Sequence, residues 1–272
     1  SQLDFAGLGV ESEACPLYEE WRNTINASRV VLVLAASYIN SPSSMYGHTF
    51  LRFDPDNMAD NSPLLSYALN FGATVNQDDA GLLYAWRGVV GGYNGQFVAN
   101  PYVDKIKEYT RLENRDLWEY QLDLSPAEVG QMLAHVWELD RVSFAYYFFD
   151  ENCSFRLLEL LEVARSDLDL TQGFDLYAIP VDTVTAVERA GLVTDVYFRP
   201  SNQDVVTFNL ELLDKQQRRL ALQLSRDSVY LQDPGFLQLN DAAQAQVAYT
   251  AYKYLRYRVN TDERDSAAAS RS

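Results

Sequence analysis

Cysteine and histidine are scarce in this chain, with two of each among 272 residues. Two distant histidines without cysteine or aspartate partners at ligand spacing do not form a zinc motif. The glycine-rich stretch 91–95 is expected to form a flexible loop, but it has neither the lysine nor the spacing of a phosphate-binding loop. The Gly-x-Ser-x-Gly turn of serine hydrolases is also missing. We therefore expect no metal ion and no cofactor.

Positive charge and long apolar runs are scarce as well. The chain has 22 Lys and Arg against 38 Asp and Glu, a formal net charge of −16. Nucleic-acid binding requires clustered Lys and Arg, so a nucleic acid is excluded as partner. The charge also disfavours broad adhesion to an anionic membrane, although a local patch could still make peripheral membrane contact. The longest apolar run, residues 30–36, is too short to cross a bilayer.

The composition is that of a globular protein, with 47% apolar and 22% charged residues. This length suits one large domain or a domain with an appendage. Residue 1 is Ser rather than Met, so any export signal is expected to lie outside the chain. We predict four segments: a lead-in at 1–28, a catalytic domain at 29–200, a helical extension at 201–260, and a disordered or linking polar tail at 261–272.

The patterns within the catalytic domain predict a mixed α+β fold, an antiparallel sheet packed on helices. A β-branched run at 29–39 indicates a strand buried on both faces. Alternation in the next strand, 48–54, places His48 and Arg52 on one face, and Asn70 shares a polar-capable face of the strand at 64–71. The remaining expected elements are helices at 17–26, 77–90, 125–141, 180–190, 210–226 and 241–258, strands at 117–124 and 193–198, and a helix beginning at Cys153.

Cys153 lies where local structure would make a thiol reactive. Asn152 is a good N-cap, so Cys153 opens a helix, and the positive end of the helix dipole favours its thiolate. Two alternatives remain open: free cysteines are often packing residues, and Cys15 could form a disulfide with Cys153. Either would remove the nucleophile.

His48 is the expected base for Cys153, because an imidazole within reach completes a nucleophile–base pair. Its alternative is a solvated residue at the edge of a strand. The other histidine, His135, lies in the middle of a predicted helix beside Trp137. It is more typical of a packed or supporting residue, although its helix leads towards Cys153.

A third group is needed to hold the imidazole tautomer, and Asn70 is the first candidate, with Ser66 the weaker one. Arg52 could bind a carboxylate or phosphate of the substrate, or form a structural ion pair instead. Tyr46 and Asn152 are predicted as further substrate-binding residues. The aromatic run 144–149 could line an acyl or glycan pocket, but such a stripe more often belongs to the core.

Several segments in combination resemble a known family. They are the histidine motif at 47–53, the cysteine motif at 151–155, residues 66–71, the glycines before Tyr93, and His135 with Trp137. Together they are similar to the N-terminal periplasmic domain family of the lipoprotein intramolecular transacylase Lnb. The similarity runs from about residue 28 to residue 199.

The resemblance implies a papain-like fold of the NlpC type in permuted order, where the histidine precedes the cysteine. The lecithin:retinol acyltransferase group shares that order, and its Asn-Cys-x-x-Phe element resembles residues 152–155 with the Phe one place early. In the transacylase, the cysteine accepts a fatty acyl chain from the glyceryl group of a lipoprotein and passes it to the N-terminal amine. Carried over by position, Cys153 would accept the acyl group and His48 would be its base.

The residues and the resemblance together predict a periplasmic cysteine enzyme that transfers acyl groups through a thioester. Its expected partners are a lipid or lipoprotein ester of the cell envelope. Two alternatives stay open: an amidase or peptidase acting on peptidoglycan, and an envelope binding module without catalytic activity.

Overall fold

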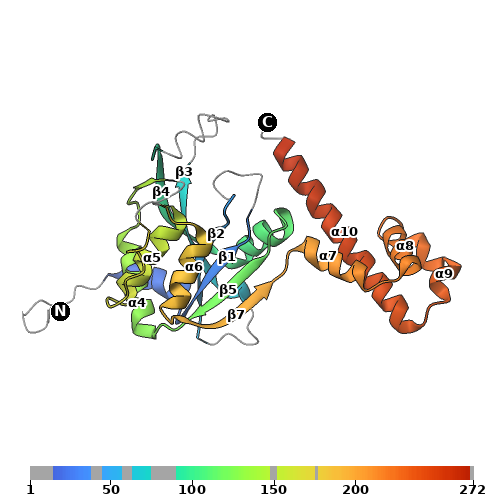
Figure 1. Cartoon of the computed structure of the whole chain (residues 1–272), viewed down its shortest axis with the longest axis horizontal. Coiled ribbons are helices and arrows are strands. Elements are labelled where there is room, and N and C mark those ends of the chain that lie inside the picture. Colours follow the sequence, from blue (N-terminus) through green and yellow to red (C-terminus); the bar gives the residue numbers. More distant parts are fainter. Residues whose placement is uncertain are drawn as a thin grey trace, which may run out of the picture.

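The sheet at the centre of the molecule is antiparallel throughout. The computed structural model describes residues 15–37, 45–56, 63–74, 90–147, 152–174 and 177–269. Seven strands pair in the order β6-β4-β3-β2-β1-β5-β7 (Figure 1). They are β1 Arg29–Ala35, β2 His48–Asp54, β3 Tyr67–Thr74, β4 Tyr93–Pro101, β5 Leu117–Leu122, β6 Phe144–Tyr146 and β7 Val193–Arg199. The predicted α+β class with an antiparallel sheet is confirmed.

Helices flank the sheet and form a C-terminal extension. Those around the sheet are α1 Pro16–Ile25, α3 Tyr102–Ile106, α4 Pro126–Glu138, α5 Cys153–Ala164 and α6 Pro180–Arg189, with the 3-10 turn η3 Pro63–Leu65 and the π-helical η4 Lys107–Leu112. The extension contains α7 Asn202–Glu211, α8 Lys215–Leu224, η5 Ser228–Gln232, α9 Pro234–Leu237 and α10 Asp241–Ala269. No helix among the described residues combines the length and apolar character needed to span a bilayer.

The sheet is covered on both faces near its centre. Strands β1 and β2 are buried almost throughout, as the β-branched run predicted for β1. On one face, Leu51 and Leu69 belong to the main core, which includes residues of α4, α5 and α6. On the other face, Phe50 packs with Tyr102 and Tyr109, which α3 and η4 supply. Core residues therefore pack against both faces of β2, the strand that begins at His48.

The sequence patterns missed two strands, β4 and β6, and placed the start of β3 incorrectly. Residues 91–95 were expected as a flexible loop, but β4 begins at Tyr93 and pairs along β3. Gly95 is required there because a Cβ would lie 2.4 Å from the ring of Phe71. Strand β3 also begins at Tyr67 instead of residue 64. The helix predicted at 77–90 falls outside the described residues, apart from Val90 in a turn.

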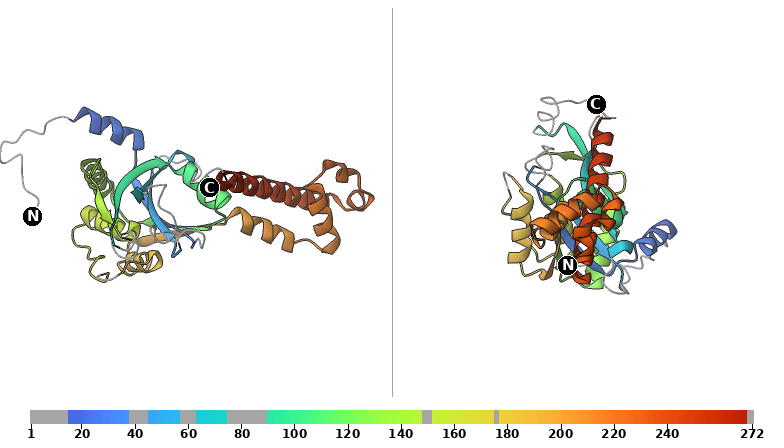
Figure 2. Two further views of the ribbon diagram at one scale, coloured as in Figure 1. Left: turned by 90° about the horizontal axis from the view of Figure 1, so that it is seen from above. Right: turned by 90° about the vertical axis from the view of Figure 1, so that its right-hand side faces the viewer.

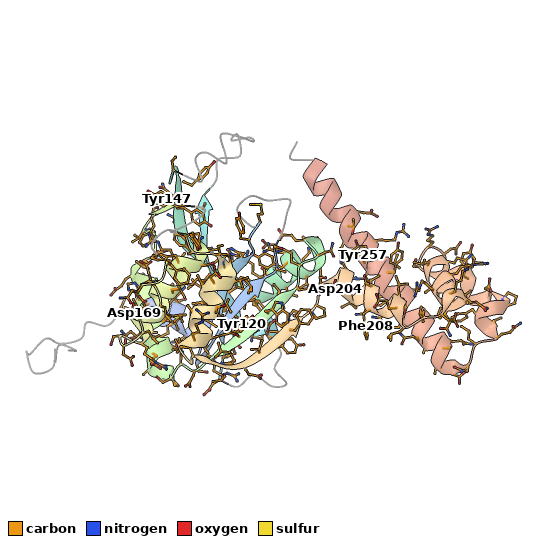
Figure 3. The ribbon with its side chains drawn as sticks, viewed as in Figure 1. Tyr120, Tyr147, Asp169, Asp204, Phe208 and Tyr257 are labelled. Atoms are coloured by element: carbon orange, nitrogen blue, oxygen red, sulfur yellow. The ribbon has the colours of Figure 1, made fainter. Side chains whose placement is uncertain are left out.

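The extension is more helical than expected. The helix predicted at 210–226 is broken into α7 and α8, because Asp214 caps a new helix through the Gln217 amide. The tail at 261–272 was predicted to be disordered or a linker, and α10 continues into it as far as Ala269. In Figure 2 these helices project from the sheet as a separate lobe. Figure 3 shows Phe208 and Tyr257 among the side chains of that lobe, apart from Tyr120 in the sheet.

Candidate active site

The site forms where two neighbouring strands separate. Strands β2 and β3 pair only over Leu51–Phe53 and Tyr67–Leu69, whereas β3 continues to Thr74 against β4. Helix α5 packs against both strands. The start of α5 thus brings Cys153 close to the end of β2 that carries His48.

Cys153 is the first residue of α5, and two contacts anchor this end of the helix. The Asn152 side chain caps α5 by accepting hydrogen bonds from the amides of Ser154 and Phe155, at 2.9 and 3.3 Å. The hydroxyls of Thr49 and Ser154 lie 2.8 Å apart and link α5 to β2. The predicted N-cap is confirmed, and these contacts position the thiol.

His48 lies between Cys153 and Asn70. Its Nε2 is 3.4 Å from Oδ1 of Asn70, across the gap where β2 and β3 separate. An amide oxygen accepts a hydrogen bond, so this contact favours a proton on Nε2 and leaves Nδ1 for the sulfur. The structure therefore brings together the three predicted catalytic residues in the order that a thiol–imidazole–amide triad requires.

The surroundings of Cys153 favour its thiolate. Burial is the largest influence and opposes ionisation, but it is outweighed by the charge of His48 and a hydrogen bond with that side chain. The Thr49 amide and the Ser154 hydroxyl add smaller favourable contributions, and the pKa of Cys153 falls from 9.0 to about 6. Within the part of the chain that the structure describes, no carboxylate is among the main influences on this thiol.

Aromatic side chains surround the buried sulfur. Cys153 clusters with Phe71, Tyr93 and Tyr146, and Phe97 and Phe144 pack against the cluster. The phenol of Tyr109 lies close enough for its pKa to be affected by Cys153, and its ring centroid is 6.1 Å from that of His48. Residues 144–146 form a strand in this cluster and not a helical stripe, so part of the aromatic run borders the sulfur.

The alternatives to the triad can now be compared with the structure. Both cysteines are free, with Cys15 exposed, so no disulfide blocks Cys153. His48, and not His135, is the histidine among the main influences that lower the pKa of Cys153. Ser66 lies before β3 and donates a hydrogen bond to Asp54 at 2.6 Å, at the opposite end of β2 from His48.

Arg52 forms the ion pair that was its alternative assignment. Its guanidinium donates two hydrogen bonds of 2.8 Å to Asp54 and also contacts Glu119. Arg199 and Tyr102 bind the same Glu119 carboxylate, at 2.6 and 2.7 Å. The network borders a cavity of about 650 Å³.

The other predicted substrate-binding residues have different surroundings. Tyr46 is about half exposed and precedes Gly47, whose φ of +99° places His48 at the start of β2. Asn152 is buried, and its Nδ2 donates to the carbonyl of Ala178 at 2.7 Å. Its observed contacts orient Cys153. Substrate binding by Arg52, Tyr46 and Asn152 stays a prediction.

The described residues contain no group of three or more His, Cys, Asp or Glu side chains placed to hold a metal ion.

Comparison with known families matches residues 17–190 to the Lnb N-terminal periplasmic domain. The chain belongs to this Lnb family. The predicted family is thereby confirmed. The family is described as a periplasmic domain, which agrees with the predicted periplasmic location of this chain. Residues 196–272 match a second family, Domain of unknown function (DUF7842). No curated protein and no solved structure matches the chain.

Proposed function

We propose that this Lnb-family chain is a cysteine-dependent acyltransferase that acts on ester-linked fatty acyl groups of envelope lipids or lipoproteins. The observation that carries the proposal is the Cys153 thiol, whose pKa is lowered to about 6 by His48 while Asn70 contacts the same imidazole. A thiolate paired with an imidazole is the nucleophile of covalent acyl transfer. A permuted papain-like fold of the NlpC type forms part of the proposal.

The first half-reaction forms a thioester. The Cys153 thiolate attacks the ester carbonyl, an Sγ–C bond forms, and the carbonyl oxygen becomes an oxyanion. Asn152 engages the amides of Ser154 and Phe155, so the amide of Cys153 is the donor at this helix start that the cap leaves for the oxyanion. When the intermediate collapses, the ester C–O bond breaks and the His48 imidazolium gives its proton to the leaving alcohol.

The second half-reaction removes the acyl group. An amine or a water molecule attacks the thioester, and neutral His48 accepts a proton from this nucleophile. The C–S bond breaks and returns Cys153 as the thiolate. An amine acceptor gives an amide product, and water gives a free fatty acid.

Two features support an apolar acyl donor. The aromatic cluster of Phe71, Tyr93 and Tyr146 borders the sulfur, and apolar surroundings favour a hydrocarbon chain over a sugar or a charged peptide. The resemblance of the histidine and cysteine motifs to the transacylase points to the same donor class.

The test is a search for the acyl-enzyme. The whole chain is incubated with a diacylated lipopeptide or a phospholipid, and its intact mass is measured before and after treatment with hydroxylamine, which cleaves thioesters. We expect one added fatty acyl group, located on Cys153 by peptide mapping and removed by hydroxylamine. Cys153→Ala should abolish the adduct, and Cys15→Ala should leave it unchanged.

Other outcomes would overturn the proposal. Release of muropeptide fragments from peptidoglycan, lost in Cys153→Ala and without any lipid adduct, would identify an amidase or peptidase. A chain that forms no adduct and releases no fragment would be a binding module.

A further inference from the structure

The charge of this acidic chain is divided unevenly. The first 200 residues contain 13 Lys and Arg against 29 Asp and Glu, whereas the last 72 contain nine of each. Within the extension, the segment 215–226 has four basic residues and no acidic one, namely Lys215, Arg218, Arg219 and Arg226. All four are exposed. Helix α8 therefore carries a local concentration of positive charge.

The four basic side chains line one groove of about 400 Å³, together with Leu222 and Gln223. The opposite side of α8 is occupied, because Leu220 and Ala221 pack into a core with residues of α10. None of the four forms an ion pair within the described part of the chain. The neighbouring carboxylates of Asp214 and Asp227 are used as caps of α8 and η5.

Exposed aliphatic side chains lie on the elements beside this groove. Both η5 and α9 pack against α8. Val229 and Leu231 of η5 are 61% and 40% exposed, and Leu237 of α9 is 55% exposed. Basic side chains beside exposed aliphatic ones are typical of surfaces that bind an anionic lipid interface.

We propose that the tip surface, defined as the four basic residues of α8 with Val229 and Leu231, docks onto an anionic phospholipid membrane. The basic groove would hold lipid phosphates, and the aliphatic side chains would enter the interface. An acidic protein partner would match the charge but would not account for two exposed aliphatic residues beside it.

The arrangement also separates the tip surface from the acidic part of the chain. Figure 1 shows α8 and α9 at the end of the extension that points away from the sheet. Repulsion between exposed charges is largely screened beyond about 8 Å at physiological salt. Docking does not depend on Cys153, so it goes beyond the proposed function, and it would hold the acyl-transfer site near a lipid surface.

The test is sedimentation of the whole chain with vesicles of phosphatidylcholine containing 30% phosphatidylglycerol, against pure phosphatidylcholine. The variant is Lys215→Gln/Arg219→Gln/Arg226→Gln. Arg218 is retained because it donates hydrogen bonds to the carbonyls of Leu210 and Leu213. Each basic residue neutralised near the membrane surface lowers the affinity for anionic vesicles about fivefold. The triple variant should therefore bind these vesicles about 100-fold more weakly.

The matched control, Arg111→Gln/Arg141→Gln/Arg256→Gln, removes three exposed charges outside the tip surface and should reduce binding less than threefold. A second variant, Val229→Asp/Leu231→Asp, should also lose vesicle binding while it keeps its helical circular dichroism. Thioester formation from a detergent-solubilised donor should persist in both tip variants, so failure of docking is distinct from failure of the proposed function.

Three results would overturn the proposal. The wild-type chain could sediment equally with both kinds of vesicle, or the control variant could lose as much binding as the tip variant. Alternatively, the wild-type chain could self-associate at low salt in the absence of lipid, and the tip variant could lose this self-association. That result would make the surface a contact with the acidic domain of a second copy.

Discussion

The variant His48→Ala is expected to form the Cys153 thioester about 10²–10⁴ times more slowly than the wild-type chain, the usual contribution of a positioned acid or base. Two effects add up. The imidazole that protonates the leaving alcohol is lost, and burial then raises the pKa of Cys153 without an opposing charge. The measurement is the rate at which the acyl adduct appears in the intact mass at pH 7.

His135→Ala is the matched control, because it removes the other histidine of the chain. His48 is the histidine that lowers the pKa of Cys153, so the His135→Ala control should retain at least half of the wild-type rate of thioester formation. An equal loss in both variants, or a full rate in His48→Ala, would contradict the proposed pairing.

The variant Arg52→Met is expected to destabilise the sheet domain by about 3–5 kcal/mol, the usual cost of removing one partner from a buried ion pair. Arg52 is buried between Asp54 and Glu119, and both carboxylates are buried as well. Without the guanidinium, each carboxylate loses a partner in a place that water reaches poorly. Urea unfolding followed by tryptophan fluorescence reports on this domain, because all four Trp residues lie before residue 200.

The destabilisation should depend on pH. Burial favours the neutral form of Glu119, but the hydrogen bond from Arg199 and the charge of Arg52 hold the pKa of this carboxyl below its ordinary value. Such a carboxyl stabilises the fold at neutral pH, and its contribution disappears as the pH falls through its folded-state pKa. The difference between wild type and Arg52→Met should therefore be largest near pH 7 and shrink towards pH 4.

Arg141→Met provides the control for this network. Arg141 pairs with Asp140, but its side chain is 92% exposed, so its removal should change the unfolding free energy by less than about 1 kcal/mol. A similar small effect of Arg52→Met would show that the buried network contributes little.

The residues of the candidate site could be placed from sequence because each depends on local signals. Asn152 marks the start of a helix, which fixes where Cys153 lies. Alternation along β2 and β3 places His48 and Asn70 on corresponding faces. The separation of the two strands above Leu51 and Leu69, which lets these side chains meet the sulfur, is a tertiary feature without a sequence signal.

Other parts of the fold depend on contacts distant in sequence. Strand β4 begins in a glycine-rich segment, and the reason for Gly95 is the ring of Phe71, which the sequence does not place. The partners of Arg52 include Glu119, which lies 67 positions away. The helical end of α10 lies in a segment predicted to be a disordered or linking tail, because its small polar composition is typical of such tails.

The most direct test of the central claim is the pH dependence of alkylation at Cys153. The wild-type chain is treated with iodoacetamide from pH 4.5 to pH 9, and peptide mass spectrometry follows Cys153 separately from the exposed Cys15. Because the thiolate is the reactive form, a pKa of about 6 predicts half-maximal reactivity of Cys153 near pH 6, with loss below it. Reactivity that rises only above pH 8, as for an unassisted thiol, would contradict an ionised nucleophile held by His48.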